Sequence, residues 1–577
     1  MAVNLHHLRL KIAAAAMVKG IAWRATRLPG PAGTAAAHAL TRASTRLTPE
    51  GEATGSYRGL LAGLLQDALR DHHTDDDAAA VSYDPVAGLV PAAGAEPVPD
   101  LPLLRQRAEQ DPRAGNLLAL AAAHRKSYIA EFEASAEFYE RAFAANPKDL
   151  RAIEGILSSG ARSHFDFARI WTYVHTLRPT KGTLSGADFW DPVEQLFAAD
   201  PSTTDSSTAQ PTAAQIEAAE AVLAAHEQDL PDLHQLLLEA LAVRLQFLGA
   251  FLTGTMIRRA MAQNRVNELR GIPLESALWV KHLMGAYAYL EQDQRLERIA
   301  AKPPVDRPHK LAHQQVDKLR ADAALWTGDA APLQELSLQR AAELELPGEQ
   351  RMRQLVLGRR VAVVGPAATA EEVGELIDAH DVVVRPRFTP EYVQTERVRI
   401  GSRTDIAYYS GLDLTRGWEQ IERSALNGDF QLAVTRPLYW PVLAQQQLPP
   451  QWLRAARFEF GLYFRGAPLG LQRILYDLLQ FAPAELSLFH ADFYASPHVL
   501  RPGYRAADSS VFGPHSPMND PVVMHDLSFE FRFTQRLVRS GLVTAHGTAG
   551  EVLTLSEAQY LERLEQLSPL GRRVGRS

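Results

Sequence analysis

The stretch RVAVVGPAATAEEVGELIDAHDVVVR, residues 360–385, decides the fold class of the second half of the chain. The apolar run 361–364 has the length of a buried strand, and Gly365 ends it. Thr369 and Glu372 have the spacing of a capping box, which predicts that a helix begins at Thr369. A second apolar run, DVVVR, follows. Strand, turn, helix and strand predict a βαβ unit with its first turn at the carboxyl edge of a sheet.

The same alternation continues over residues 355–577. Short β-branched runs such as FQLAVTRP and AELSLFHADFY alternate with helical segments, which predicts an α/β domain with a mostly parallel sheet. Open α/β sheets bind ligands at their carboxyl edge, where a helix start favours phosphate. The turn at Gly365 has neither G-x-G-x-x-G nor G-K-[ST], so it is not a nucleotide signature by itself.

Residues 101–350 have apolar side chains at helical spacing and predict an all-helical domain. One of its helices matches the second helix of a tetratricopeptide repeat at Ser135, Tyr139, Ala142 and Pro147, but the preceding helix does not match. A generic helical hairpin explains this half-match equally well. Arrays of helices often bind a protein partner, which is one expectation for this region.

The first 100 residues are divided between two expected segments. Residues 1–71 predict a helical segment, and residues 72–100, rich in Ala, Pro, Gly and Asp without a period, predict a linker. Basic residues flank apolar ones within 1–28, as in a helix that lies on an anionic membrane surface. A helix packed on its own protein is the alternative. The longest uncharged stretch in 1–28 is too short to span a bilayer.

Composition excludes several classes of protein. A chain of 577 residues predicts three or four units at roughly 150 residues each. The formal net charge of −7 argues against a general nucleic-acid binder. The lack of cysteine excludes disulfides, zinc–thiolate sites and thiol nucleophiles, and it is compatible with a reducing cytoplasm.

Four segments of the second half follow the order of one family's motifs. VAVVG, ELIDAHDVVVR and GSRTD, within 361–405, resemble the large sialyl motif of glycosyltransferase family 29, the eukaryotic-type sialyltransferases. Segments 465–494, 515–520 and 525–544 resemble the family's small, third and last motifs. The resemblance covers about residues 360–545.

The resemblance implies a Rossmann-like, GT-A-variant domain. Such a domain would transfer a nonulosonic acid (sialic acid, Kdn or a relative) from a CMP-linked donor to a glycan acceptor, with inversion and without a metal or other cofactor. His525 would be the general base, and His515 would donate to the phosphate. The positions implied for the nucleotide are Gly365, Pro366, Ala367, Arg385, Arg387, Leu469 and Gly470. Without a secretion signal, the expected setting is the bacterial cytoplasm, in the synthesis of a cell-surface polysaccharide.

Several positions depart from the family pattern. Pro366 and Arg387 stand where the large motif has Asn, and Pro468 and Leu469 stand where the small motif has Ser-Thr. In the family these polar residues help to hold the CMP part of the donor. Nucleotide contact is therefore expected through backbone amides and arginines, or the donor differs, for example CMP-Kdo. The remaining alternative is a non-catalytic interaction protein with a degenerate transferase domain.

His525 also has the chemistry of a general base without the resemblance, because an imidazole ordinarily titrates near neutrality. Asp526 or Ser528 can cap a helix that begins just after it, and the start of that helix favours an anionic sugar nucleotide. Glu530 either orients His525 or merely lies in the first helical turn. The alternative is that His515 and His525 are two ordinary loop histidines.

His490 ends the strand ELSLFH at a position where the family prefers Gly, and Asp492 follows it. Both residues either contact a ligand or cap the end of the strand. Arg385 is expected either to bind a phosphate or to pair with Asp381 or Asp378.

Overall fold

The computed structural model describes nine stretches of the chain. They are residues 99–126, 129–163, 166–198, 211–269, 277–301, 310–439, 450–466, 468–496 and 525–568. The predicted helical segment 1–71 with its membrane-associated part, the linker 72–100 apart from its last two residues, and His515 lie outside the described residues.

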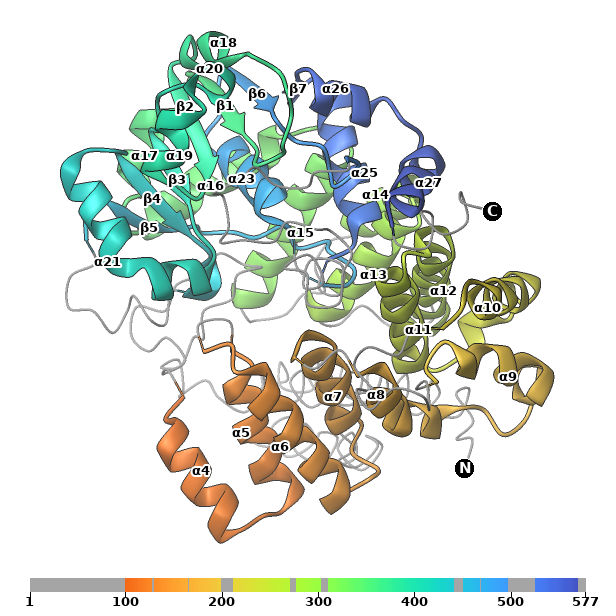
Figure 1. Cartoon of the computed structure of the whole chain (residues 1–577). Coiled ribbons are helices and arrows are strands. Elements are labelled where there is room, and N and C mark those ends of the chain that lie inside the picture. The colour runs from red at the N-terminus through yellow and green to blue at the C-terminus, as the bar shows by residue number, and fades with distance from the viewer. Residues whose placement is uncertain are drawn as a thin grey trace, which may run out of the picture.

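Helices fill the first half of the described chain, as predicted (Figure 1). They are α4 Leu101–Gln110, α5 Ala114–His124, α6 Phe132–Ala145, α7 Leu150–Ser163, α8 Phe167–Val174, α9 Ala187–Gln195, α10 Ala213–Ala225, α11 Gln235–Leu248, α12 Phe251–Leu269, α13 Ala277–Tyr289, α14 Asp293–Ala300, α15 Lys310–Trp326, α16 Ala331–Glu343 and α17 Glu349–Val356. Helices α4–α8 form the orange and brown group at the bottom of Figure 1. No helix among the described residues is both long and apolar enough to cross a bilayer.

Three of the four residues that match a tetratricopeptide helix lie on the buried face of α6, and Pro147 follows the end of that helix. Ser135, Tyr139 and Ala142 are buried, and the Ser135 hydroxyl donates to the carbonyl of Ala121 on α5 at 2.9 Å. The ring of Tyr139 occupies the space beside Gly155 on α7, where an added Cβ would lie 2.3 Å from the ring. The half-match therefore reflects close packing of α6 between its two neighbouring helices.

A seven-stranded sheet follows the helices, and all its pairings are parallel. Its strands are β1 Arg360–Val364, β2 Val382–Pro386, β3 Ile406–Tyr408, β4 Leu432–Thr435, β5 Leu453–Ala455, β6 Glu485–Phe489 and β7 Thr544–Ala545. The order across the sheet is β5-β4-β3-β2-β1-β6-β7. Val361 of β1 is in register with Val382 of β2 on one side and with Leu486 of β6 on the other. The predicted fold class, helices followed by an α/β domain with a parallel sheet, is confirmed.

Eight helices of the described chain belong to the α/β part. They are α18 Gly374–Asp378, α19 Pro390–Thr395, α20 Arg397–Ile400, α21 Gly411–Asn427, α23 Gly470–Leu479, α25 Leu527–Arg539, α26 Thr548–Leu553 and α27 Glu557–Leu567. The helix expected to begin at Thr369 begins only at Gly374, so the capping-box prediction is wrong. The Thr369 hydroxyl instead contacts the His490 ring at 2.5 Å, and neighbouring Glu371 accepts from the amide of Thr548. The contact with His490 takes the Thr369 hydroxyl that the N-cap would need.

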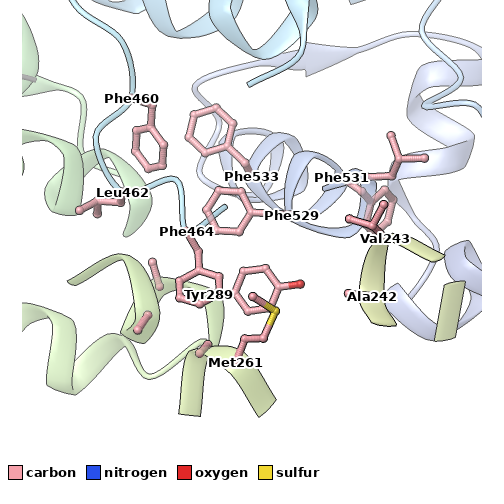
Figure 2. Close-up of a cluster of buried hydrophobic side chains, with 14 of the residues drawn as sticks. Ala242, Val243, Met261, Tyr289, Phe460, Leu462, Phe464, Phe529, Phe531 and Phe533 are labelled. Carbon is pink, nitrogen blue, oxygen red and sulfur yellow. The ribbon is translucent and has the colours of Figure 1, made fainter. Parts of the chain in front are cut away.

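One hydrophobic core runs through the helical and the α/β parts. Phe529 of α25 stacks on Tyr289 of α13, with ring centroids 5.8 Å apart (Figure 2). A buried ion pair between Glu349 of α17 and Arg457, shortly after β5, joins the same two parts. The helices up to α17 therefore support the sheet directly, and they share its apolar interior.

Candidate active site

The order of the sheet reverses between β1 and β6, which are neighbours. From β1 the chain proceeds through β2 to β5 on one side, and then it returns to β6 and β7 on the other. Open α/β sheets bind ligands outside the carboxyl ends of the strands at such a point. Gly365 follows β1 and His490 follows β6. The turns after these two strands therefore lie at the point where the strand order reverses.

Hydrogen bonds between the two loops close the turn at Gly365. The Gly365 amide donates to the carbonyl of Phe489 at 2.8 Å, and the Ala367 amide donates to the carbonyl of His490 at 3.0 Å. Pro366 has no N–H group. A Cβ on Gly365 would lie 2.4 Å from the His490 carbonyl oxygen, so only glycine permits this approach. Both amides therefore already have partners within the protein.

His490 is a fully buried connection between three segments. Its Nε2 donates to the carbonyl of Arg399 at 2.9 Å, so in the neutral ring Nδ1 accepts from the Thr369 hydroxyl at 2.5 Å. Both ring nitrogens therefore have protein partners. These contacts match the expectation that His490 caps the end of the strand, and the expectation of a ligand contact stays a prediction.

The chain after β6 has a strained backbone. His490, Phe493 and Tyr494 have φ of 50°, 51° and 64°, a region that costs a non-glycine residue about 1–2 kcal/mol. Asp492 holds this loop by accepting from the Tyr494 amide at 3.0 Å, and burial raises the pKa of its carboxyl to about 6. Strain of this kind gathers at functional sites, so it indicates a site at this edge of the sheet.

Arg385 stabilises a loop and is not directed to a phosphate site. Its guanidinium donates to the Thr404 hydroxyl at 2.9 Å and to the carbonyls of Ile400 at 2.6 Å and Arg403 at 2.9 Å. The side chain is buried. The GSRTD part of the large-motif resemblance is therefore the loop that Arg385 binds.

The carboxylates expected as alternative partners of Arg385 have other partners. Asp378 accepts from the Ser402 amide at 2.8 Å, and Asp381 accepts from the Arg360 amide at 2.9 Å. Both contacts fasten segments of the large-motif resemblance to one another. Asp378 and Asp381 therefore stabilise the local fold.

Arg387 keeps part of its side chain exposed at the carboxyl end of β2. It has a positive φ of 58°, and its amide donates to the Tyr408 carbonyl at 2.8 Å. The guanidinium lies 3.2 Å from Asp413 at the start of α21. About a third of the Arg387 side chain, 32%, is exposed, so a ligand at this edge can reach it.

Helix α23 begins at Gly470, which is exposed, and its start is joined to α25. The Leu469 amide donates to Oε1 of Glu530 at 2.7 Å, and the Tyr463 hydroxyl donates to the same oxygen. Burial raises the pKa of Glu530 to about 8. Glu530 lies in the first turn of α25, and its carboxyl group is directed to α23.

Asp526 caps helix α25, as predicted, and this fixes the residue before it, His525. Oδ1 of Asp526 accepts from the Phe529 amide at 3.0 Å, and Oδ2 accepts from the Tyr289 hydroxyl at 2.7 Å. Arg258 of α12 lies 3.5 Å from the same carboxylate, and both side chains are buried. The helical part thus holds the start of α25, whereas His525 itself stays partly exposed.

Connectivity brings these segments to one edge. Helix α23 leads into β6 and α25 leads into β7, so in a parallel sheet each helix starts at the carboxyl edge. The Gly365 turn, the His490 loop, Leu469 with Gly470, and His525 all lie at that edge.

Arg436, Glu459 and Arg473 form a cluster that was not predicted from the sequence. Arg436 follows β4 directly, so the rule that identified Gly365 could also have identified it. Nothing in the sequence pattern indicates that Glu459 and Arg473 join it. The three residues meet only through the packing of α23 on the sheet.

Among the described residues, no three His, Asp or Glu side chains gather in a way that could hold a metal ion. Comparison of the sequence with protein-family models and with curated proteins gives no match.

Proposed function

We propose that the protein transfers a nonulosonic acid from a CMP-linked donor to a glycan acceptor. The observation that carries this proposal is the hydrogen bond from the Leu469 amide to Glu530, which joins the starts of α23 and α25. Two segments that resemble sialyltransferase motifs therefore meet. They do so at the edge of the sheet where the segment resembling the large motif has its Gly365 turn.

The proposed reaction requires a base for the acceptor hydroxyl and stabilisation of the leaving phosphate. The acceptor oxygen attacks the anomeric carbon of the nonulosonic acid, and its proton passes to His525. The bond between that carbon and the phosphate oxygen breaks, and CMP leaves with the electron pair. Helix α25 begins beside His525, so its positive end favours the anionic donor.

Because the Gly365 turn is closed, the start of α23 is the better site for the phosphate. The first backbone N–H groups of a helix have no partner within the helix and bind anions. Glu530 does not repel an anion there at neutral pH, because a pKa of about 8 keeps its carboxyl largely protonated. Gly470, at the first helical position, lets a ligand approach closely.

The test is incubation of the purified protein with CMP-linked sialic acid, Kdn and Kdo, followed by measurement of CMP release. The expected result is release from at least one donor. His525→Ala should abolish most of this release while CMP binding persists. Absence of both CMP release and CMP binding with every donor would sink the proposal.

A second candidate, a non-catalytic interaction protein, is favoured by the closed turn. The amides of Gly365 and Ala367 and both ring nitrogens of His490 have protein partners, as in a site that no longer binds its ligand. The helical part would then bind a protein partner. Calorimetry with CMP separates the two candidates, because an enzyme should bind it with a dissociation constant of about 1 μM to 1 mM.

A further inference from the structure

Three charged side chains converge at the carboxyl edge of the sheet beside the start of α23. Arg436 directly follows β4, Glu459 comes shortly after β5, and Arg473 is the fourth residue of α23. Arg436 donates to Oε1 of Glu459 at 3.0 Å and to Oε2 at 3.5 Å. Nε of Arg473 lies 3.8 Å from the same Oε1. Two guanidinium groups therefore share one carboxylate.

The positive charge of this cluster is only partly compensated. Glu459 supplies one negative charge; burial acts to raise its pKa, but Arg436 and Arg473 hold it below the usual value. Glu530 is the next carboxyl group near Arg473, and its pKa of about 8 leaves it mostly neutral at pH 7. One positive charge therefore remains over this group of four side chains.

The location of Arg473 is unfavourable without a further anion. A cation near a helix start opposes the helix dipole, which favours negative charge there. Burial and the neighbouring Arg436 both lower the pKa of Arg473, to about 9. Solvent still reaches the cluster, since Arg436, Glu459 and Arg473 keep 16%, 16% and 17% of their side chains exposed. An anion bound at this partly exposed edge would supply the missing negative charge.

We propose that Arg436 and Arg473 form a subsite for the carboxylate of an acidic sugar, with Glu459 occupying the subsite in the absence of ligand. Guanidinium groups bind carboxylates with paired hydrogen bonds, which Arg436 already makes to Glu459. The identity of the sugar as a nonulosonic acid rests on the proposed function; binding of a carboxylate does not. The carboxylate belongs either to the donor sugar or to an acidic residue at the end of the acceptor.

Calorimetry with free N-acetylneuraminic acid and with its methyl ester tests the subsite. The acid should bind the whole protein at least tenfold more tightly than the uncharged ester. Arg473→Met and Arg436→Met should each weaken binding of the acid at least tenfold. Arg539→Met, at the exposed far end of α25, is the matched control and should change nothing.

Glu459→Gln separates the proposal from a mere loss of folding. Removal of the carboxylate that competes for both guanidinium groups should tighten binding of the acid at least threefold. A damaged fold would weaken binding instead. The proposal is overturned if acid and ester bind equally, if Arg473→Met binds the acid as the unmodified protein does, or if Glu459→Gln weakens binding.

Kinetics with a CMP-linked donor distinguish the two sources of the carboxylate. If the donor supplies it, Arg473→Met raises the KM for the donor with a neutral acceptor. If the acceptor supplies it, Arg473→Met instead reduces the preference for acidic over neutral acceptors. Failure of CMP release while the acid still binds would refute the proposed function alone. Normal release with both parameters unchanged in Arg473→Met would refute the subsite alone.

Discussion

Glu530→Gln should make the protein more stable at alkaline pH and leave its stability unchanged at acidic pH. Burial raises the pKa of Glu530 from 4.5 to about 8 in the folded chain. The protonated carboxyl therefore favours the folded state fully below pH 4.5, and this contribution is lost as the pH rises through 8. Glutamine is neutral at every pH, and its carbonyl oxygen can still accept from the Leu469 amide and the Tyr463 hydroxyl.

The size of the effect follows from the two pKa values. Over the interval from pH 5 to pH 8, the free energy of unfolding of the wild type should fall by about 3–4 kcal/mol through Glu530, at 1.36 kcal/mol per pH unit. The free energy of unfolding of the Gln variant should not fall in this way, because glutamine does not titrate. Titrating groups that do not interact with Glu530 contribute equally to both proteins and cancel in the difference.

The measurement is the urea midpoint of wild type and Glu530→Gln at a series of pH values from 5 to 9. The urea midpoint of the variant should rise steadily relative to that of the wild type up to pH 8. Glu551→Gln, an exposed position on α26, is the control and should follow the wild type. Parallel curves for wild type and Glu530→Gln, or a variant that is less stable at pH 8, would refute the argument that Glu530 is buried and protonated.

Three other predictions concern the sheet edge and the core. Gly365→Ala should destabilise the fold by about 2–4 kcal/mol, from a forced contact and weakened loop hydrogen bonds, whereas Gly470→Ala, where the added Cβ meets nothing within 4 Å, should leave the urea midpoint nearly unchanged. His525→Ala should lower turnover about 10²–10⁴-fold with CMP affinity preserved, so a loss of CMP affinity of similar size would exclude a role as base. Asp477→Asn should cost about 3–5 kcal/mol in thermal or urea unfolding, because it leaves buried Arg454 without its counter-charge; a loss below 1 kcal/mol would show that water reaches the pair.

The local sequence pattern was sufficient to predict strand β1, the cap of helix α25 and the parallel sheet. The apolar run before Gly365 forms β1 because β-branched residues suit a strand buried on both faces. Asp526 caps α25 because the interaction spans only three residues, from its carboxylate to the Phe529 amide. The parallel sheet was predicted from the alternation of strands and helices. Two parallel neighbours need a long connection between them, which is usually a helix.

The roles of the candidate site residues required the tertiary structure. Glu530 was expected either to orient His525, five residues away, or merely to lie in the first helical turn. It lies in that turn, and its carboxyl group binds Leu469, sixty-one residues away. Arg385 was expected either to bind a phosphate or to pair with Asp381 or Asp378, but its guanidinium binds carbonyls of the loop near Ile400. In both cases a buried polar group takes whichever partner packing brings within reach, because leaving it unsatisfied costs about 1–3 kcal/mol.

The sequence by itself determined that helices precede a parallel α/β domain, because hydrophobic periodicity and connection length act over a few residues at a time. It also determined which turns lie at the carboxyl edge. Only the tertiary structure decided that the Gly365 turn is closed by the carbonyls of Phe489 and His490, and that Arg436 and Arg473 meet over one carboxylate. Those contacts join residues that lie far apart in the chain. Their geometry depends on how whole strands and helices pack, so no local sequence pattern predicts them.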